Sequence, residues 1–427
     1  MILPKQFIVS VLLAAAPTSA IPQNKLTAAR KPKPYTANPK IGPGGAIFKD
    51  SSHFRVYGTN GTGADQVLSV LEASYDCFVG TLGFRSSGLS FHDTSSSGIR
   101  TKTNVYSVPN LQGAAGYFAA DGETGMGWLV VDSAGLADST TAVHEYGHAL
   151  NYHQITWVDQ IRTGAWWETF AEWVSDTYRT SDICAPARKS RKLPTGYSIV
   201  NLYKNIGESF QPIVDVSNYY EAFPIFTYLT NNPDRYTGLG PPTLRLMMER
   251  YSISSNETPL HTLQRLVGKT SVADIIGRYW ARMAYVDIGS ARAREAFLYH
   301  RQNLNYANVD SNGQGRYTVK PGRKPQYMGS NIIPITAHSR GGKVTVTIST
   351  KGPYRATLAL YKNGATRYIT LRKNTASVSV ASGEEMSLAV AHTPGLILYD
   401  PFTPSGEVKQ GLDYSFKLSG ATVTAFL

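Results

Sequence analysis

The stretch DSTTAVHEYGHAL at residues 138–150 decides how this chain is interpreted. Asp138 precedes it as a helix cap, and the small and apolar residues that follow allow a helix to continue through the motif. Residues four apart lie on one face of a helix, about 6 Å apart along its axis, so His144 and His148 can hold one metal ion. Glu145 lies beside this pair and is a candidate general base.

Gly147 lies inside the expected helix, where glycine costs roughly 1 kcal/mol relative to alanine. We therefore expect another element to approach the helix closely at this residue. The alternative for the whole motif is two structural histidines that happen to be four residues apart.

A Zn²⁺ site that keeps one position open needs three protein ligands, so a third ligand is required besides His144 and His148. A third histidine in a His-Glu-x-x-His-x-x-Gly-x-x-His pattern is excluded, because Asn151 and Gln154 occupy the glycine and histidine positions. His153 lies about 140° around the helix from His148 and cannot extend its face.

Residues 166–178 (WWETFAEWVSDTY) offer a third ligand from a second helix. Glu168 and Glu172 lie one turn apart among aromatic residues, so both can project from one side of a largely buried helix. Two buried carboxylates are costly unless a cation and a ligand histidine N–H satisfy them. The alternative is an amphipathic helix with a solvated acidic edge.

His144, Glu145, His148 and Glu168 together resemble the pattern of the gluzincin metallopeptidases, the clan of thermolysin, bacterial collagenases and zinc aminopeptidases. The resemblance covers residues 139–178 of the 427. It implies a zincin-like fold in which the two histidines and Glu168 bind zinc. It also implies that Glu145 serves as general base and then as proton donor.

Two readings of the second helix remain open. Glu168 to Glu172 resembles the Glu-x-x-Ala-Glu run of collagenase-type members, in which Glu172 orients a ligand histidine. Glu172 to Asp176 resembles the Glu-x-x-x-Asp form of thermolysin, which would shift the ligand by one turn. We prefer Glu168 because twenty residues after His148 matches the shorter connection.

The gluzincin pattern also places a strand before the active helix, where it pairs with the substrate backbone. Gly125, Gly127 and Trp128 are in the right place, and the glycines leave room for a peptide to add as a strand. A core edge strand is the alternative. The aminopeptidase Gly-Ala-Met-Glu-Asn signature is absent from the sequence, which favours an endopeptidase.

Such a site needs a hydrogen-bond donor for the developing oxyanion, commonly a tyrosine or a histidine. Tyr220 is the best candidate, and Tyr219 and His261 are the others.

The N-terminus has the layout of a signal peptide at residues 1–20, with Lys5, an apolar run of about ten residues and a small-residue cleavage site. Residues 21–45 are basic and rich in proline, and they are interpreted as a flexible extension or a pro-segment. Export implies an oxidising compartment, so we expect Cys77 and Cys184 to form one disulfide.

The chain has 42 Lys plus Arg against 30 Asp plus Glu, a net charge of +12, and the basic residues form no single stripe. It contains no nucleic-acid-binding motif, so we expect no nucleic-acid partner. An acidic cell-wall polymer or glycan is a more plausible partner. No run after the signal peptide reaches the length of a membrane span, so we expect none.

The composition and periodicity predict an α+β chain of two domains. Residues 46–300 are mostly helical after a small N-terminal sheet and form the expected metallopeptidase domain. Residues 301–330 are interpreted as a linker. Residues 331–427 alternate with a period of two and form an expected β-sandwich, in which Asn363-Gly364 is a type I′ hairpin turn.

The sequence therefore predicts a secreted zinc peptidase that hydrolyses peptide bonds with metal-activated water and a glutamate base. The substrate is expected to be a protein or peptide. Two alternatives remain: a non-enzymatic binder of glycan or cell-wall polymer on a zincin scaffold, and a zinc hydrolase of a non-peptide amide or ester.

Overall fold

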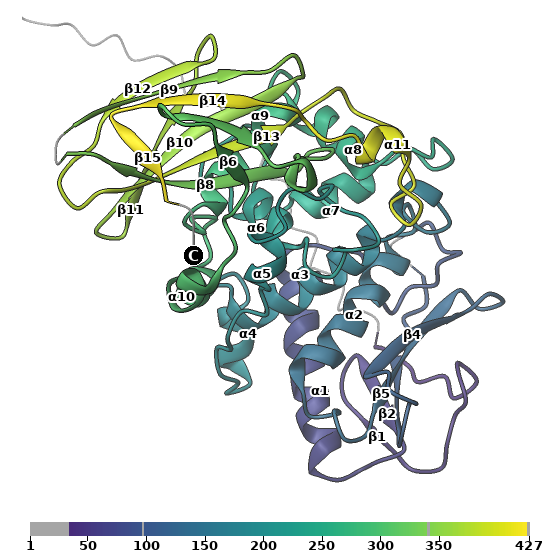
Figure 1. The fold of residues 1–427 in the computed structure, drawn as a ribbon. Coiled ribbons are helices and arrows are strands. Elements are labelled where there is room, and N and C mark those ends of the chain that lie inside the picture. The colour runs from purple at the N-terminus through teal and green to yellow at the C-terminus, as the bar shows by residue number, and fades with distance from the viewer. Residues whose placement is uncertain (1–33, 96–97, 340–341, 425–427) are drawn as a thin grey trace, which may run out of the picture. The chain divides into compact units, whose positions relative to one another are not determined.

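The computed structural model describes residues 34–95, 98–339 and 342–424 (Figure 1). The predicted signal peptide and the first part of the predicted extension lie outside these residues. From Tyr35 onward the chain forms one compact unit. None of the helices in the described ranges is long and apolar enough to cross a membrane.

Residues 35–45 of the predicted extension pack against the rest of the compact unit. The Tyr35 hydroxyl lies 2.7 Å from Ser86 Oγ. Ile41 is buried, and its carbonyl accepts hydrogen bonds from the Tyr106 hydroxyl at 2.6 Å and from Asn104 Nδ2 at 2.8 Å. This segment is therefore held in place by buried contacts and is not a flexible extension.

The first sheet has the strand order β1-β2-β3-β5-β4. β2, β3 and β5 are parallel, whereas β1 and β4 are antiparallel to their neighbours at the two edges. The helix α2 follows β5 directly and packs against β5 and β4. The strands are β1 (Phe48–Asp50), β2 (Phe54–Tyr57), β3 (Thr103–Val108), β4 (Gly116–Asp121) and β5 (Met126–Asp132).

Helices follow the first sheet up to residue 300, and α1 lies between β2 and β3; the apolar faces of these helices share one core with that sheet. They are α1 (Thr62–Tyr75), α2 (Ser139–His153), α3 (Trp166–Thr180), α4 (Ala185–Ser190), α5 (Leu202–Asn205), α6 (Pro224–Asn231), α7 (Thr243–Glu249), α8 (Pro259–Val267), α9 (Val272–Met283) and α10 (Ala291–His300), with the short α11 (Gly406–Lys409) near the C-terminus.

Two antiparallel five-stranded sheets form the C-terminal part, with the orders β11-β10-β13-β8-β15 and β12-β9-β14-β7-β6. The chain therefore mixes helix and sheet, as the sequence predicts. The first of these sheets contains β8 (Ser330–Ala337), β10 (Tyr354–Lys362), β11 (Ala365–Thr370), β13 (Glu385–His392) and β15 (Ala421–Val423). The second contains β6 (Val309–Ser311), β7 (Arg316–Val319), β9 (Lys343–Ser349), β12 (Thr375–Ser379) and β14 (Ser415–Ser419).

The sheet that contains β10 and β13 is covered on both faces. Leu358 and Leu388 belong to a core shared with the other C-terminal sheet, whereas Ala359 and Ala389 belong to the core shared with the helices. The side chains alternate because successive residues of a strand point to opposite faces. Small alanines on the helix side leave room for α9, which packs against both strands (Figure 1).

Local signals agree with the observed turns and cross-links. Asn363 and Gly364 both have positive φ, 49° and 84°, in the hairpin that joins β10 to β11, as the predicted turn type requires. The predicted linker contains two short strands, β6 and β7, because residues such as Tyr317 are buried against the C-terminal sheets. The predicted disulfide between Cys77 and Cys184 is present and ties the end of α1 to the start of α4.

Candidate metal centre

Helix α2 presents His144, Glu145 and His148 in the region of the first sheet. Asp138 caps the helix, because its side chain accepts a hydrogen bond from the Thr140 backbone N–H at 2.8 Å. The two histidines are one turn apart, as the sequence predicts, and their Nε2 atoms lie 3.2 Å from each other.

Helix α3 crosses α2 at Gly147. A Cβ atom at this glycine would lie 2.6 Å from the Cα of Ala171, so only glycine allows the two helices to come this close. Ala171 lies between Glu168 and Glu172 on α3. The close approach therefore brings both carboxylates to the histidines of α2, which explains why glycine interrupts a helix that would otherwise favour alanine.

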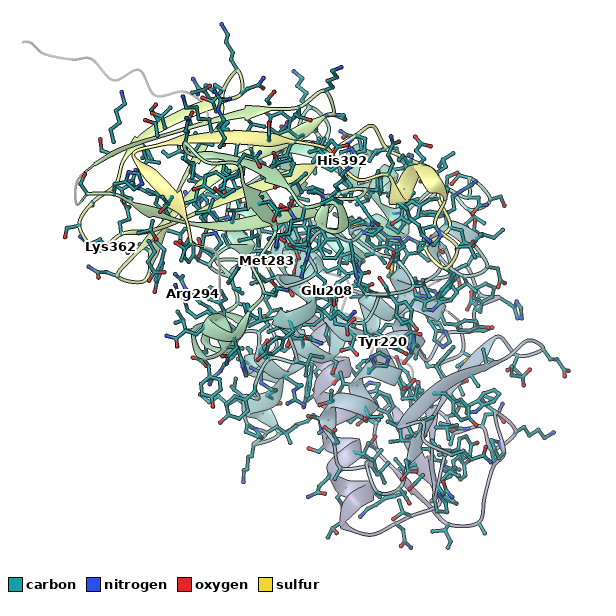
Figure 2. All side chains as sticks on the ribbon, viewed as in Figure 1. Glu208, Tyr220, Met283, Arg294, Lys362 and His392 are labelled. Carbon is teal, nitrogen blue, oxygen red and sulfur yellow. A yellow bond between two sulfur atoms is a disulfide. The ribbon has the colours of Figure 1, made fainter. Side chains whose placement is uncertain are left out.

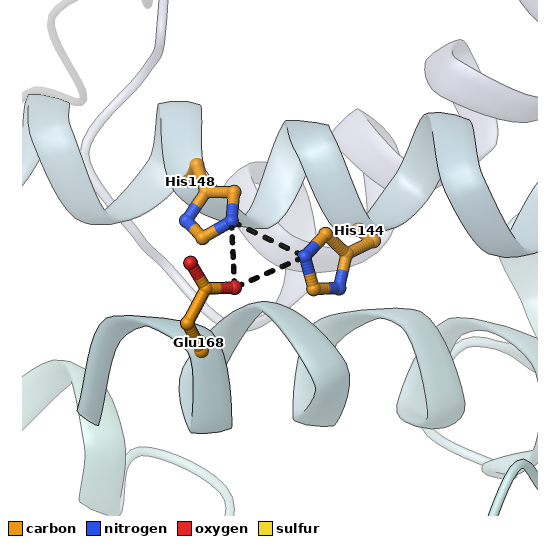
Figure 3. Close-up of side chains that lie close together, drawn as sticks. All are labelled: His144, His148 and Glu168. Carbon is orange, nitrogen blue, oxygen red and sulfur yellow. Dashed lines mark hydrogen bonds and ion pairs between the residues drawn. The ribbon is translucent and has the colours of Figure 1, made fainter. Parts of the chain in front are cut away.

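Three ligand atoms converge between the two helices (Figure 3). The Oε2 atom of Glu168 lies 3.3 Å from His144 Nε2 and 3.2 Å from His148 Nε2. Glu168 is in the first turn of α3, where the helix dipole favours a negative charge. The three residues form a group that could hold one metal ion.

The carboxylates control the charge of this cluster. Burial alone would disfavour a charged His144, but its contacts with Glu168 and Glu172 outweigh burial and raise its pKa to about 10. Burial would likewise raise the pKa of Glu168, but His144 and His148 outweigh burial and lower it to about 2. The cluster is therefore built around a carboxylate that attracts positive charge.

The two readings of α3 differ in geometry. Glu172 Oε1 lies 3.3 Å from Nδ1 of His144, on the ring atom that faces away from Glu168. Asp176 is buried elsewhere and accepts hydrogen bonds from the Ser198 hydroxyl at 2.7 Å and the Ile199 backbone N–H at 2.9 Å. Glu168 is thus the carboxylate that meets both Nε2 atoms, and Asp176 anchors the segment after α4.

Glu145 is buried beside the cluster, with 5% of its surface exposed. Burial raises its pKa. A Cβ atom at Gly116, on β4, would lie 3.0 Å from Glu145 Oε1, so this glycine makes room for the carboxylate. Glu145 therefore stands between the histidine face of α2 and the edge strand of the first sheet.

A cavity of about 450 Å³ opens over the cluster. Its walls come from β4, α2, the loop after α2, the start of α3 and the segment before α6. The lining residues are Gly116, Tyr117, Phe118, His144, Glu145, His148, Asn151, Tyr152, Val158, Asp159, Trp167, Glu168 and Tyr220.

Residues 58–424 match a family described as "Family of unknown function (DUF6055)". The chain belongs to the DUF6055 family. No curated protein matches it. Among solved structures it is similar to hydroxypropylphosphonic acid epoxidase from S. wedmorenis, at 10% identity and a TM-score of 0.13, over 51% of this chain and 99% of that one. A TM-score this low carries no argument about fold or function.

In this DUF6055 chain, Tyr220, labelled in Figure 2, is one of the residues that line the cavity. Its ring centroid is 6.0 Å from that of His144. Burial and the nearby Glu168 raise its pKa to about 12, so its hydroxyl keeps a proton near neutral pH. His261 is outside the cavity lining and lies 2.8 Å from the Thr258 hydroxyl, and Tyr219 packs against Phe402.

In the DUF6055 chain, the strand predicted to pair with the substrate backbone is not an edge strand of the sheet. Trp128 is on β5 and pairs with β3 on one side and β4 on the other, so its backbone has no edge free for a peptide. Gly127 is covered by the Phe118 ring, and Gly125 packs against Ser90. These glycines serve the packing of the sheet, and the edge strand beside the cluster is β4.

Sequence reasoning missed several cavity residues. Asn151 is three residues after His148, and this helical spacing alone would have placed it on the same face. Residues 116–118 gave no signal, because β4 is a half-exposed edge strand. Asp159 lies in a loop without periodicity, so only the folded chain brings it to the cavity.

Proposed function

We propose that this protein is a secreted zinc-dependent endopeptidase with a zincin-like catalytic domain. The observation that carries the proposal is the convergence of His144 Nε2, His148 Nε2 and Glu168 Oε2 beside the buried Glu145. The disulfide between Cys77 and Cys184 supports the proposed export, because such bonds persist in oxidising compartments.

The donor set fits Zn²⁺. Four ligands in a tetrahedron at zinc–ligand distances of 2.0–2.1 Å lie about 3.4 Å from one another. The three atoms of the cluster lie 3.2 Å to 3.3 Å apart. When bound by His144, His148 and Glu168, the ion would supply Lewis acidity, polarising a carbonyl and making water more acidic.

Glu145 and Glu172 have separate roles in this proposal. Glu145 takes a proton from the attacking water and delivers it to the leaving amide nitrogen. Its raised pKa suits a base that must also act as an acid near neutral pH. Glu172 accepts the Nδ1 proton of His144, which keeps the Nε2 lone pair directed at the ligand cluster.

Tyr220 is the proposed donor to the oxygen that becomes negative as water attacks the scissile carbonyl. Its hydroxyl is protonated near neutral pH, and its ring centroid lies 6.0 Å from that of His144. A hydrogen bond that strengthens as charge develops lowers the barrier of the chemical step.

β4 is the proposed docking strand for the substrate backbone. It is an edge strand of the first sheet, and its first three residues, Gly116, Tyr117 and Phe118, line the cavity. A peptide that adds to this edge would pass over Glu145 and the histidines, with its backbone hydrogen bonds supplied by the strand.

The test is hydrolysis of casein by the zinc-loaded protein, with and without a chelator. We expect hydrolysis that stops with chelator and returns with zinc. Glu145→Gln should lower the rate at least about a hundredfold, whereas Asp182→Asn, which removes an exposed carboxylate outside the cavity lining, should leave it unchanged. Hydrolysis that persists in chelator, or in Glu145→Gln, contradicts the proposal.

A further inference from the structure

The cavity continues beyond His148 along the same face of α2, where it reaches Asn151. This side chain is 5% exposed, and its Oδ1 atom has no hydrogen-bond partner within the described chain. This oxygen is shielded from the cavity, so Asn151 forms part of the wall at this end.

Asp159 lines the same end of the cavity. Its side chain is exposed, and no hydrogen bond or ion pair involves its carboxylate anywhere in residues 34–95, 98–339 and 342–424. Its φ of 56° is left-handed, a conformation that aspartate tolerates better than most residues. Burial, followed by the charges of Asp159 and Asp121, raises the pKa of the Tyr152 hydroxyl. The charged group at this end of the cavity is therefore a carboxylate.

Aromatic rings form the rest of this end. Phe118 from β4 and Tyr152 from α2 lie with ring centroids 5.4 Å apart, and Trp167 from α3 is a third aromatic residue of the cavity lining. Aromatic faces attract Lys and Arg side chains through their quadrupoles, and they also cover the aliphatic stem of such a side chain.

The cavity lining differs in composition from the chain as a whole. The full chain carries +12, yet none of the residues that line the cavity is Lys or Arg, and three of them are Asp or Glu. A neutral side chain would leave the Asp159 charge without a counterion, and an acidic side chain would be repelled by it.

We infer that the cavity end formed by Phe118, Asn151, Tyr152, Asp159 and Trp167 is a subsite for a lysine or arginine side chain of the substrate, next to the bond that is cleaved. The inference rests on the proposed peptidase function, and it names the class of substrate that the site selects. The Asp159 carboxylate accepts hydrogen bonds from the cation, and the aromatic rings enclose its stem.

The first arm of the test maps cleavage sites in a mixed peptide library by mass spectrometry. We expect Lys or Arg to be enriched at one position near the cleaved bond. Asp159→Asn should reduce this enrichment about tenfold, and Asp159→Lys should replace it with Asp or Glu. Asp182→Asn removes a comparable exposed carboxylate outside the cavity and should change nothing.

The second arm measures binding to zinc-loaded Glu145→Gln protein by calorimetry, with acetylated hexa-alanine amides that carry either one Lys or one Gln at each position in turn. We expect one Lys peptide to bind about tenfold more tightly than its Gln partner, and Asp159→Asn to remove the difference.

The two arms separate failure of the subsite from failure of the peptidase. Cleavage without basic enrichment overturns the subsite and leaves the peptidase standing. Absence of any cleavage contradicts the peptidase, and the binding arm then decides the subsite alone. Equal binding of the Lys and Gln peptides at every position overturns the subsite in either case.

Discussion

The close packing of Gly147 on Ala171 holds the two helices of the centre together, and Gly147→Ala tests its role. The added Cβ would lie 2.6 Å from the Cα of Ala171 and 3.3 Å from its carbonyl oxygen. Carbon atoms that touch are normally 3.5–4.0 Å apart, so the helices must separate by about 1 Å. The closest neighbour is a backbone atom, which cannot move away as a flexible side chain can.

The expected effects follow from this separation. Overpacking costs about 1–3 kcal/mol, and the better helix propensity of alanine offsets up to about 1 kcal/mol of it. The ligand atoms tolerate much smaller displacements, because metal bonds vary by only about 0.2 Å. We therefore expect zinc affinity to fall about 10–100-fold, comparable to other disturbances of ligand support.

The assay is urea unfolding in chelator for stability, with competition against a chromophoric chelator for zinc affinity. Gly63→Ala is the matched control, because this glycine is also in a helix and its Cβ would have no neighbour closer than 3.8 Å. Adding Ala171→Gly to Gly147→Ala should restore little, because the added methyl group would still meet the backbone of α3. Wild-type zinc affinity in Gly147→Ala would refute the reasoning.

Three further changes test other parts of the structure. His153 is buried, and burial followed by the charge of Arg85 lowers its pKa to about 3. The unfolded chain therefore takes up a proton at this histidine from about pH 6.5 downward, whereas the folded chain does not. Because of this difference, the free energy of unfolding should fall by about 1.4 kcal/mol per pH unit between pH 6 and pH 4. His153→Leu should remove that part of the slope in urea titrations, and His338→Leu, at an exposed histidine, should not. Replacing Cys77 and Cys184 by serine opens a loop of 107 residues and should lower the free energy of unfolding by up to about 4 kcal/mol; a loss below about 1 kcal/mol would contradict the role given to the disulfide. Tyr220→Phe should lower kcat about 100-fold with KM and zinc content unchanged, and an unchanged kcat would remove Tyr220 from the oxyanion role.

Local rules predicted the parts of the site that lie within one helix. The spacing of His144 and His148 needs only the helical repeat, and the cost of Gly147 inside a helix predicted a close neighbour, which proves to be Ala171. The strands of the C-terminal sheets were predictable where polar and apolar residues alternate, as in β9, and the Asn363-Gly364 turn followed from its required backbone conformation.

The parts that the sequence did not reveal depend on packing between distant segments. Residues 116–121 form an edge strand whose half-exposed side chains carry no strong periodicity. The order of strands in the first sheet puts β4 next to β5, so β4 takes the edge position that the sequence suggested for Gly125, Gly127 and Trp128. Asp159 belongs to an irregular loop, and its place in the cavity depends on the crossing of α2 and α3.

The central claim is tested most directly by zinc analysis of reconstituted, desalted protein, for the wild type beside Glu145→Gln, Glu168→Gln and Glu172→Gln. The account predicts one zinc per chain in the wild type and in Glu145→Gln, a weakened but detectable zinc in Glu172→Gln, and loss of zinc in Glu168→Gln. Equal zinc in all four proteins, or none in the wild type, would contradict a centre built from His144, His148 and Glu168.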